Sequence, residues 1–158
     1  MDLAFKRIDV RQHFALCYQF RCDAYQCSFD SLEGCDQMLV GYQERLLERI
    51  DDPCYYYLHI WLDGKIIGQL EFKNFYDSAN TGYVNLIYLS EPYRGCGLAE
   101  QLQKYIEWQL TEAGCRCALL SVSRTNARAL RHYQRFGWRY LKANPKHSST
   151  DFYQRLFS

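Results

Sequence analysis

The residues from Tyr93 to Glu100 read YRGCGLAE, and two glycines separated by one residue stand where an extended segment passes into a helical pattern. At a helix start several backbone N–H groups lack a partner within the helix, and the helix dipole adds positive potential. Glycine lets an anion approach the backbone without a Cβ in the way. Arg94 adds a positive charge beside the turn. The pattern predicts a diphosphate site, with a tight turn that binds nothing as the alternative.

Two common phosphate-binding motifs do not fit this turn. The dinucleotide fingerprint requires G-x-G-x-x-G at the first βα unit, with an acidic residue about 20 positions on. Here Glu100 occupies the place of the third glycine, the turn lies past mid-chain, and residues 117–120 read CALL. No GxxxxGK[ST] sequence occurs, so a P-loop is excluded. A nucleotide-binding oxidoreductase is therefore disfavoured.

Two blocks of the sequence resemble the GCN5-related N-acetyltransferase (GNAT) superfamily. Residues 94–99, RGCGLA, match its R/Q-x-x-G-x-G/A motif. Residues 126–138, NARALRHYQRFGW, resemble its N-x-x-A-x-x-x-Y-x-x-x-G-F element, with tryptophan in the last position. The separation of the two blocks suits one helix and one strand. The resemblance covers the order of elements along all 158 residues.

The resemblance implies an enzyme that binds acetyl-CoA and passes the acetyl group directly to a primary amine of a small molecule or protein. Main-chain groups at Ile87 and Leu89 would pair with the pantetheine arm, and an N–H near Leu89 would stabilise the oxyanion. Asn126 would contact the cofactor. Tyr133 would contact it too, and would act as the general acid toward the departing thiolate. The pyrophosphate would be held by the backbone amides of Arg94, Gly95, Cys96, Gly97, Leu98 and Ala99.

The general base stays open. Tyr83 and Asn85 stand where some relatives carry a glutamate, and neither is a good base near neutral pH. Glu71 is the nearest strand carboxylate, and we interpret it as a solvated structural charge. His132 is expected to point away from Tyr133. A chain of waters is the remaining route.

The acceptor cleft is implied to lie between residues 25–34 and 143–151. An aromatic lining and an acidic loop would attract a cationic amine such as a polyamine, an aminoglycoside or a lysine, although a solvated face and ordinary strand tyrosines explain the same residues. A non-catalytic acyl-CoA-binding sensor on the same scaffold is the alternative function. The residues concerned are Asp23, Asp30, Glu33 and Asp36, with Tyr55, Tyr56, Tyr57 and Tyr76.

The elements that position these residues form one α/β domain, residues 1–158, with a mixed, mostly antiparallel sheet flanked by helices, the GNAT fold. The predicted order is β-α-α-β-β-β-α-β-α-β-β. Asp63-Gly64 predicts a hairpin turn, Asn126 a helix cap, and Gly114 and Gly137 helix ends. Predicted strands are 5–10, 55–62, 65–76, 83–89, 115–122, 138–143 and 151–157, and predicted helices are 11–27, 35–50, 98–113 and 126–136.

Composition bounds the remaining possibilities. The chain is 48% hydrophobic with a net charge of +1 and no long basic run, so it predicts a folded protein rather than a nucleic-acid-binding module. No apolar run is long enough for a membrane span, and the N-terminus has no secretory pattern, so we expect a cytoplasmic protein without a membrane partner. The 8 cysteines form no CxxC pair, which predicts free thiols and no metal. Exposed sheet edges would permit a homodimer.

Overall fold

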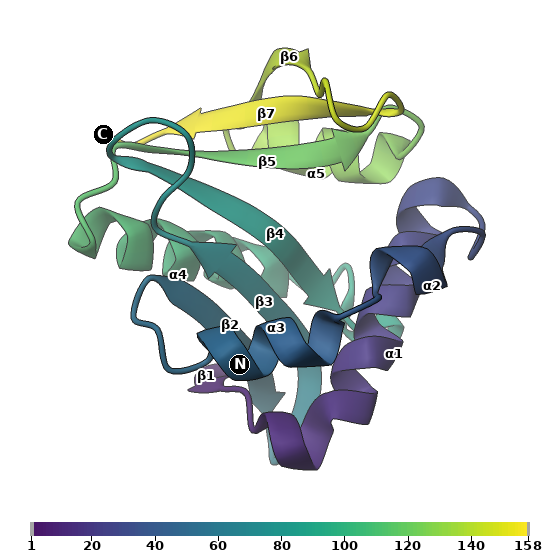
Figure 1. Ribbon diagram of the computed structural model, residues 1–158. Coiled ribbons are helices and arrows are strands. Elements are labelled where there is room, and N and C mark those ends of the chain that lie inside the picture. The colour runs from purple at the N-terminus through teal and green to yellow at the C-terminus, as the bar shows by residue number, and fades with distance from the viewer. Residues whose placement is uncertain (1, 158) are drawn as a thin grey trace.

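The computed structural model describes residues 2–157, and its centre is a seven-stranded sheet with the order β1-β2-β3-β4-β5-β7-β6 (Figure 1). Strands β4 and β5 run parallel, whereas the other neighbouring pairs are antiparallel. The mixed, mostly antiparallel sheet is therefore confirmed. The strands are β1 (Ala4–Arg7), β2 (Tyr55–Leu62), β3 (Lys65–Lys73), β4 (Thr81–Leu89), β5 (Cys117–Ser123), β6 (Arg139–Ala143) and β7 (Thr150–Leu156).

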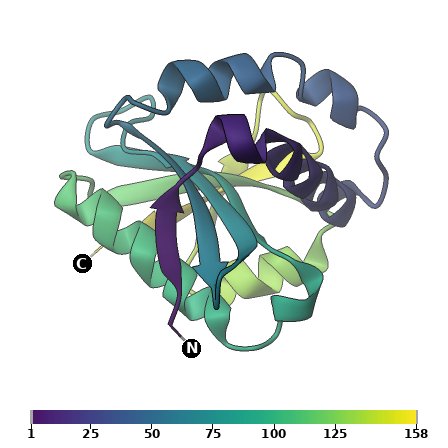
Figure 2. The ribbon, with the colours of Figure 1, turned by 90° about the horizontal axis from the view of Figure 1, so that it is seen from below.

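Helices cover both faces of the sheet (Figure 2). On one face lie α1 (Val10–Phe29), α2 (Cys35–Met38) and α3 (Tyr42–Arg49). On the other lie α4 (Leu98–Glu112) and α5 (Ala127–Arg135), and a short 3-10 helix η1 (Glu91–Tyr93) precedes α4. Among residues 2–157, no helix combines the length and the apolar character that crossing a bilayer would require.

The predicted element order holds with two changes. The single helix expected over residues 35–50 is two helices, because Gly41 adopts φ +76° and interrupts the helical path before α3. The 3-10 turn η1 was not predicted. The hairpin between β2 and β3 is confirmed, since Asp63 and Gly64 have φ of +50° and +78°, the pair of positive values that a tight hairpin turn needs.

The apolar core lies between the sheet and α4. The predicted stripe of α4 is buried, and it packs on Leu70 and Phe72 of β3. Each such fully buried side chain contributes about 1.5–3 kcal/mol of hydrophobic stabilisation. Gly82 of β4 lets α4 approach, because a Cβ there would lie 2.8 Å from Leu110. The stripe consists of Leu98, Leu102, Ile106 and Leu110.

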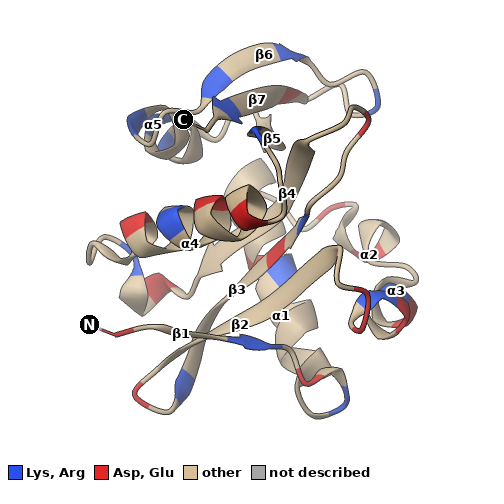
Figure 3. Ribbon diagram, turned by 90° about the vertical axis from the view of Figure 1, so that its left-hand side faces the viewer, with Lys and Arg blue, Asp and Glu red and all other residues tan. Residues whose placement is uncertain are grey.

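The opposite face of the sheet is more polar. His59, Gln69 and Glu71 are buried there beneath α1 and α3. At the molecular surface Lys and Arg alternate with Asp and Glu along α3 and α4 (Figure 3). The surface charges are solvated by water, whereas the buried polar side chains need hydrogen-bond partners within the protein.

Candidate active site

Strands β4 and β5 pair over only half of their lengths and then separate. Their register runs from Thr81↔Cys117 to Val84↔Leu120, although β4 continues to Leu89. The cause lies on the other edge of β4, where Glu71 pairs with Leu86 but Phe72 pairs with Val84, so that Asn85 is an extra residue. Such a β-bulge bends its strand. The two strands diverge beyond it (Figure 1).

The separated ends of β4 and β5 form one side of a cleft of about 460 Å³. The N–H of Ser90 donates to the carbonyl of Ile67 on β3, 2.8 Å away. In an antiparallel pair alternate residues direct their backbone groups toward the partner strand. The N–H groups of Ile87 and Leu89 and the C=O of Ile87 therefore face the cleft, where an extended ligand would meet them, whereas the C=O of Leu89 accepts from the side chain of Arg94. Both residues line it, as do Ala24, Ser121 and Val122, which the sequence did not single out, and Cys27 and Ser28, which fall in the segment 25–34 expected to shape the acceptor cleft.

The glycine turn lies at the mouth of the cleft. Gly95 and Gly97 have φ of +73° and +81°, and a Cβ built on either would meet no described atom within 4 Å. Gly97 is the N-cap of α4 and supplies no side-chain cap, so the first-turn amides, including those of Leu98 and Ala99, keep their hydrogen-bonding capacity. The two glycines thus allow the left-handed backbone conformation of the turn and also leave open space beside its amides.

Arg94 is bound within the protein. Its N–H donates to the carbonyl of Glu91 at 3.1 Å, and its Nε donates to the carbonyl of Leu89 at 2.7 Å. Its Nη2 forms an ion pair with Asp23 of α1 at 3.0 Å, and the guanidinium lies over the ring of Tyr88. Arg94 therefore holds the end of β4, the glycine turn and α1 together.

Helix α5 forms the opposite wall. Because β4 and β5 are parallel, the helices that follow them, α4 and α5, both begin at the edge where the cleft opens. The Oδ1 of Asn126 accepts from the N–H of Ala129 at 3.1 Å, which confirms the predicted cap and fixes the start of α5. Asn126, Arg128, Ala129, His132 and Tyr133 all line the cleft.

Tyr133 lies two turns into α5, deeper along this wall. It is half-buried, and its hydroxyl makes no hydrogen bond to any residue of the described chain. Its ring packs edge-on against Trp138, with centroids 6.1 Å apart. Burial raises the pKa of Tyr133 to about 12, so the phenol stays protonated at neutral pH and has a proton to donate. The predicted catalytic side chain is thus in the cleft with its hydroxyl uncommitted.

His132 does not point away from Tyr133 as predicted: the two rings lie edge to face with centroids 5.2 Å apart, and His132 also lines the cleft. The indole of Trp138 donates to Oε1 of Gln103 at 3.0 Å, which turns the amide nitrogen of Gln103 toward Nε2 of His132 at 3.3 Å. That ring nitrogen therefore accepts, and the imidazole is neutral. Burial, together with the charges of Arg135 and Arg128, lowers the pKa of His132. His132 follows Arg128 by four residues, so the two side chains lie on the same face of α5.

Glu71 was interpreted as a solvated charge, and this was wrong: its exposed fraction is 3%. Its carboxylate accepts from the hydroxyl of Tyr42 and, at 2.7 Å, from the amide of Gln69. Gln69 in turn contacts His59 at 2.8 Å. Burial, followed by the charge of Glu71, raises the pKa of Tyr42. The network was visible in sequence only as polar residues at alternate strand positions, 69 and 71.

The buried network adjoins the cleft without opening into it. Arg21 of α1 lies over the ring of Tyr42 and reaches the carbonyl of Asn85 at 3.5 Å. Asn85 is exposed and lines the cleft, whereas Tyr83 stacks on Tyr76 with centroids 4.4 Å apart. No carboxylate from residues 2–157 lines the cleft.

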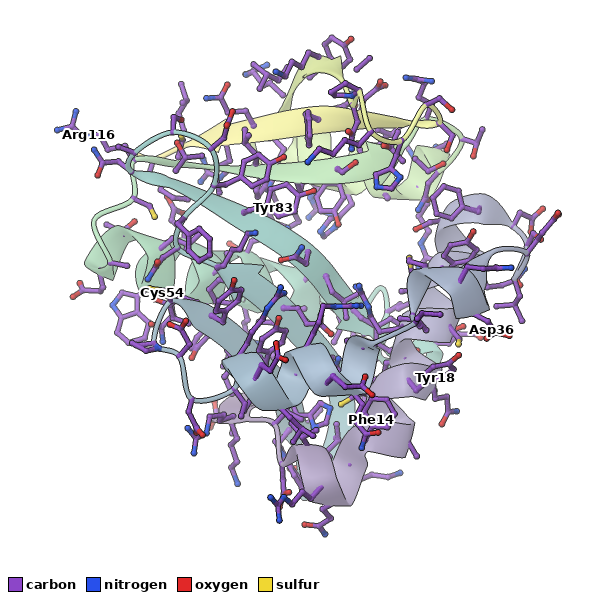
Figure 4. All side chains as sticks on the ribbon, in the orientation of Figure 1. Phe14, Tyr18, Asp36, Cys54, Tyr83 and Arg116 are labelled. Atoms are coloured by element: carbon purple, nitrogen blue, oxygen red, sulfur yellow. The ribbon has the colours of Figure 1, made fainter. Side chains whose placement is uncertain are left out.

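The residues expected to shape the acceptor cleft do not act as one group. Asp36 of α2 accepts from the hydroxyl of Tyr18 on α1 at 2.8 Å (Figure 4). Tyr56 stacks on Phe72 on the α4 side of the sheet, whereas Tyr57 belongs to the core cluster under α3. The acidic and aromatic residues are therefore mostly committed to packing and hydrogen bonds.

A seven-stranded mixed sheet with helices on both faces, which a bulge splits between its two parallel strands, is the fold of the acyl-CoA N-acyltransferases. The chain belongs to the acetyltransferase (GNAT) family, whose model matches residues 14–138. The predicted superfamily is confirmed.

Individual relatives agree with this assignment. The chain is 30% identical over 95 residues to the spermine/spermidine N(1)-acetyltransferase of Bacillus subtilis, an alignment that spans 55% of this chain and 62% of that relative. The PaiA N-acetyltransferase of Thermoplasma acidophilum, in complex with coenzyme A, superposes with a TM-score of 0.83 at 17% identity, covering 99% of this chain and 100% of that one. YncA of Salmonella typhimurium, with acetyl-CoA, gives a TM-score of 0.69 at 16% identity over 100% and 95% of the two chains.

Proposed function

We propose that this protein transfers the acetyl group of acetyl-CoA to a primary amine. One observation carries the proposal: Gly95 of the glycine turn and Ala99 in the first turn of α4, the backbone N–H groups of Ile87 and Leu89, and the free hydroxyl of Tyr133 border the same cleft. The order along the cleft matches an extended ligand with phosphates at one end and a thioester at the other.

The residues present fit coenzyme A. A diphosphate needs backbone donors and room, and the positive φ of Gly95 and Gly97 supplies both, since a Cβ at either would project into open space. In this proposal the amides from Gly95 to Ala99 hold the diphosphate. The amide of Arg94 is already used by Glu91, so we give Arg94 the task of fixing the turn.

The catalytic steps need three tasks from the chain. Acetyl-CoA, when bound, supplies an activated acyl group. The N–H of Leu89 or Ile87 would donate to the carbonyl oxygen of that group, because both face the cleft. Tyr133 would give its proton to the departing thiolate, which a phenol within hydrogen-bond distance does readily. Water at the exposed Asn85 would take the proton of the amine, since the lining holds no carboxylate among residues 2–157 and His132 already accepts from Gln103.

Small cationic amines, polyamines first, are the acceptors we propose. The name of the Bacillus subtilis relative supports this choice. The loop after α1 adds Asp30 and Glu33 close to the α1 residues Cys27 and Ser28, which line the cleft. Carboxylates near a cleft raise the local concentration of a cationic substrate.

Two measurements on the whole chain test the proposal. Calorimetric titration with acetyl-CoA measures binding, and a thiol-release assay with spermidine, spermine, aminoglycosides and a lysine-containing peptide measures transfer. Release of thiol that depends on an added amine supports the enzyme. Binding without transfer to any of these amines would favour the acyl-CoA-binding sensor. Absence of acetyl-CoA binding would refute both the acetyltransferase and the sensor function.

A further inference from the structure

The charged side chains that line the cleft are unequal. Two arginines border it, Arg94 beside the glycine turn and Arg128 in the first turn of α5, and the lining holds no aspartate or glutamate among the residues that the structure describes. A ligand with phosphate groups therefore meets a cleft with an excess of positive charge. What matters is which arginine is available to it.

The guanidinium of Arg94 has partners on every nitrogen. Nε donates to the carbonyl of Leu89, Nη2 pairs with Asp23, and Nη1 lies 3.7 Å from the sulfur of Cys27. The charge of Asp23 offsets its charge, and a phosphate would have to displace Asp23 to gain a full contact. Arg94 is thus a poor phosphate ligand in this chain.

Arg128 is in the opposite situation. It is exposed, and within residues 2–157 its side chain has neither an ion pair nor a hydrogen bond. It lies at the mouth of the cleft, because α5 starts at the same sheet edge as α4. Helix α5 carries arginines and no acidic residue, whereas α4 carries both signs (Figure 3). Nothing on its own helix neutralises Arg128.

We infer that Arg128 contacts a phosphate group of coenzyme A from the α5 side of the cleft, opposite the amides of the glycine turn. The inference rests on the proposed function and adds a residue to it. An arginine forks readily around phosphate oxygens. The diphosphate and the 3′-phosphate share this chemistry, and dephospho-coenzyme A, which lacks the latter, distinguishes them.

Arg128→Gln tests the inference against a matched control, Arg131→Gln. Both arginines are exposed on α5 and both changes remove one positive charge, but only Arg128 lines the cleft. Calorimetric titration of coenzyme A and of dephospho-coenzyme A at low and high salt gives the affinities. We expect Arg128→Gln to weaken coenzyme A binding about tenfold at low salt, the effect of one lost charge-assisted hydrogen bond, and less at high salt. Arg131→Gln should bind as the wild type does.

Each outcome decides the matter. A loss that persists with dephospho-coenzyme A assigns Arg128 to the diphosphate, and a loss that disappears assigns it to the 3′-phosphate. An Arg128→Gln variant that binds coenzyme A as tightly as the wild type, or an equal loss in Arg131→Gln, overturns the inference alone. A wild-type chain that binds no coenzyme A overturns the proposed function as well.

Discussion

Gly97→Ala distinguishes two roles of Gly97: it adopts a positive φ, and it leaves space for the proposed diphosphate. At φ +81° an L-residue pays a backbone strain of about 1 kcal/mol. The added methyl group meets no described atom within 4 Å, so the folded chain accommodates it without a clash. The same methyl group would project into the space where the proposed diphosphate approaches the amides of Gly97 and Leu98.

The magnitudes follow from these two effects. A strain of about 1 kcal/mol lowers the melting temperature by about 3 °C in a chain of this length. Loss of one amide-to-phosphate hydrogen bond, about 1.5–3 kcal/mol for a charged acceptor, weakens coenzyme A binding about 10- to 100-fold. Stability should therefore change little and affinity much.

Gly114→Ala is the matched control. Gly114 ends the same helix, α4, with φ +92° and nothing within 4 Å of a built Cβ. The two glycines lie at opposite ends of a helix about 22 Å long. Thermal denaturation should show similar losses for both variants, while calorimetric titration with coenzyme A should show a loss for Gly97→Ala alone. If Gly97→Ala retained wild-type affinity, the glycine amides would not be the diphosphate site.

Three further outcomes are expected. Tyr133→Phe removes one hydroxyl and leaves the ring packed, so turnover should fall about 10- to 10⁴-fold with coenzyme A affinity unchanged; normal turnover would exclude Tyr133 as the acid. Glu71→Leu leaves the hydroxyl of Tyr42 buried without its acceptor, so urea denaturation should show a loss of about 3 kcal/mol, and a neutral effect would contradict a tightly satisfied network. Burial lowers the pKa of His59 from 6.5 to about 4. Between these two pH values the imidazole is protonated in the unfolded chain but not in the folded chain. Stability should be complete above pH 6.5 and decline by about 3 kcal/mol as the pH falls to 4; melting curves of His59→Gln should lack that part of the slope.

Local sequence signals predicted well wherever the decisive interaction is local. The Asp63-Gly64 turn, the Asn126 cap and the apolar stripe of α4 each depend on residues within a few positions of one another. The prediction of a single helix over residues 35–50 was wrong because Gly41 interrupts it. An isolated glycine in a helical pattern is only a weak signal for a helix end, so the sequence did not predict the break.

The errors fall where distant segments meet. Glu71 lies in a strand, and its burial depends on α3 bringing Tyr42 over it from 29 positions away. His132 is drawn into the cleft wall by Gln103 and Trp138. Patterns along the chain carry no information about which side chain such a partner will meet.

The sequence by itself determined the class of this protein, because the glycine turn and the Asn126–Trp138 block express backbone requirements that are local and therefore readable. Tertiary structure alone decided which polar groups remain free for a ligand. Arg94 and Arg128 are the same residue type and lie at the same cleft. Asp23 on α1 forms an ion pair with Arg94, whereas Arg128 is exposed. A side chain can bind a ligand only with the hydrogen-bonding groups that its neighbours in the fold leave unpaired. The residue type sets how many such groups it has, but only the folded chain decides which neighbours it meets.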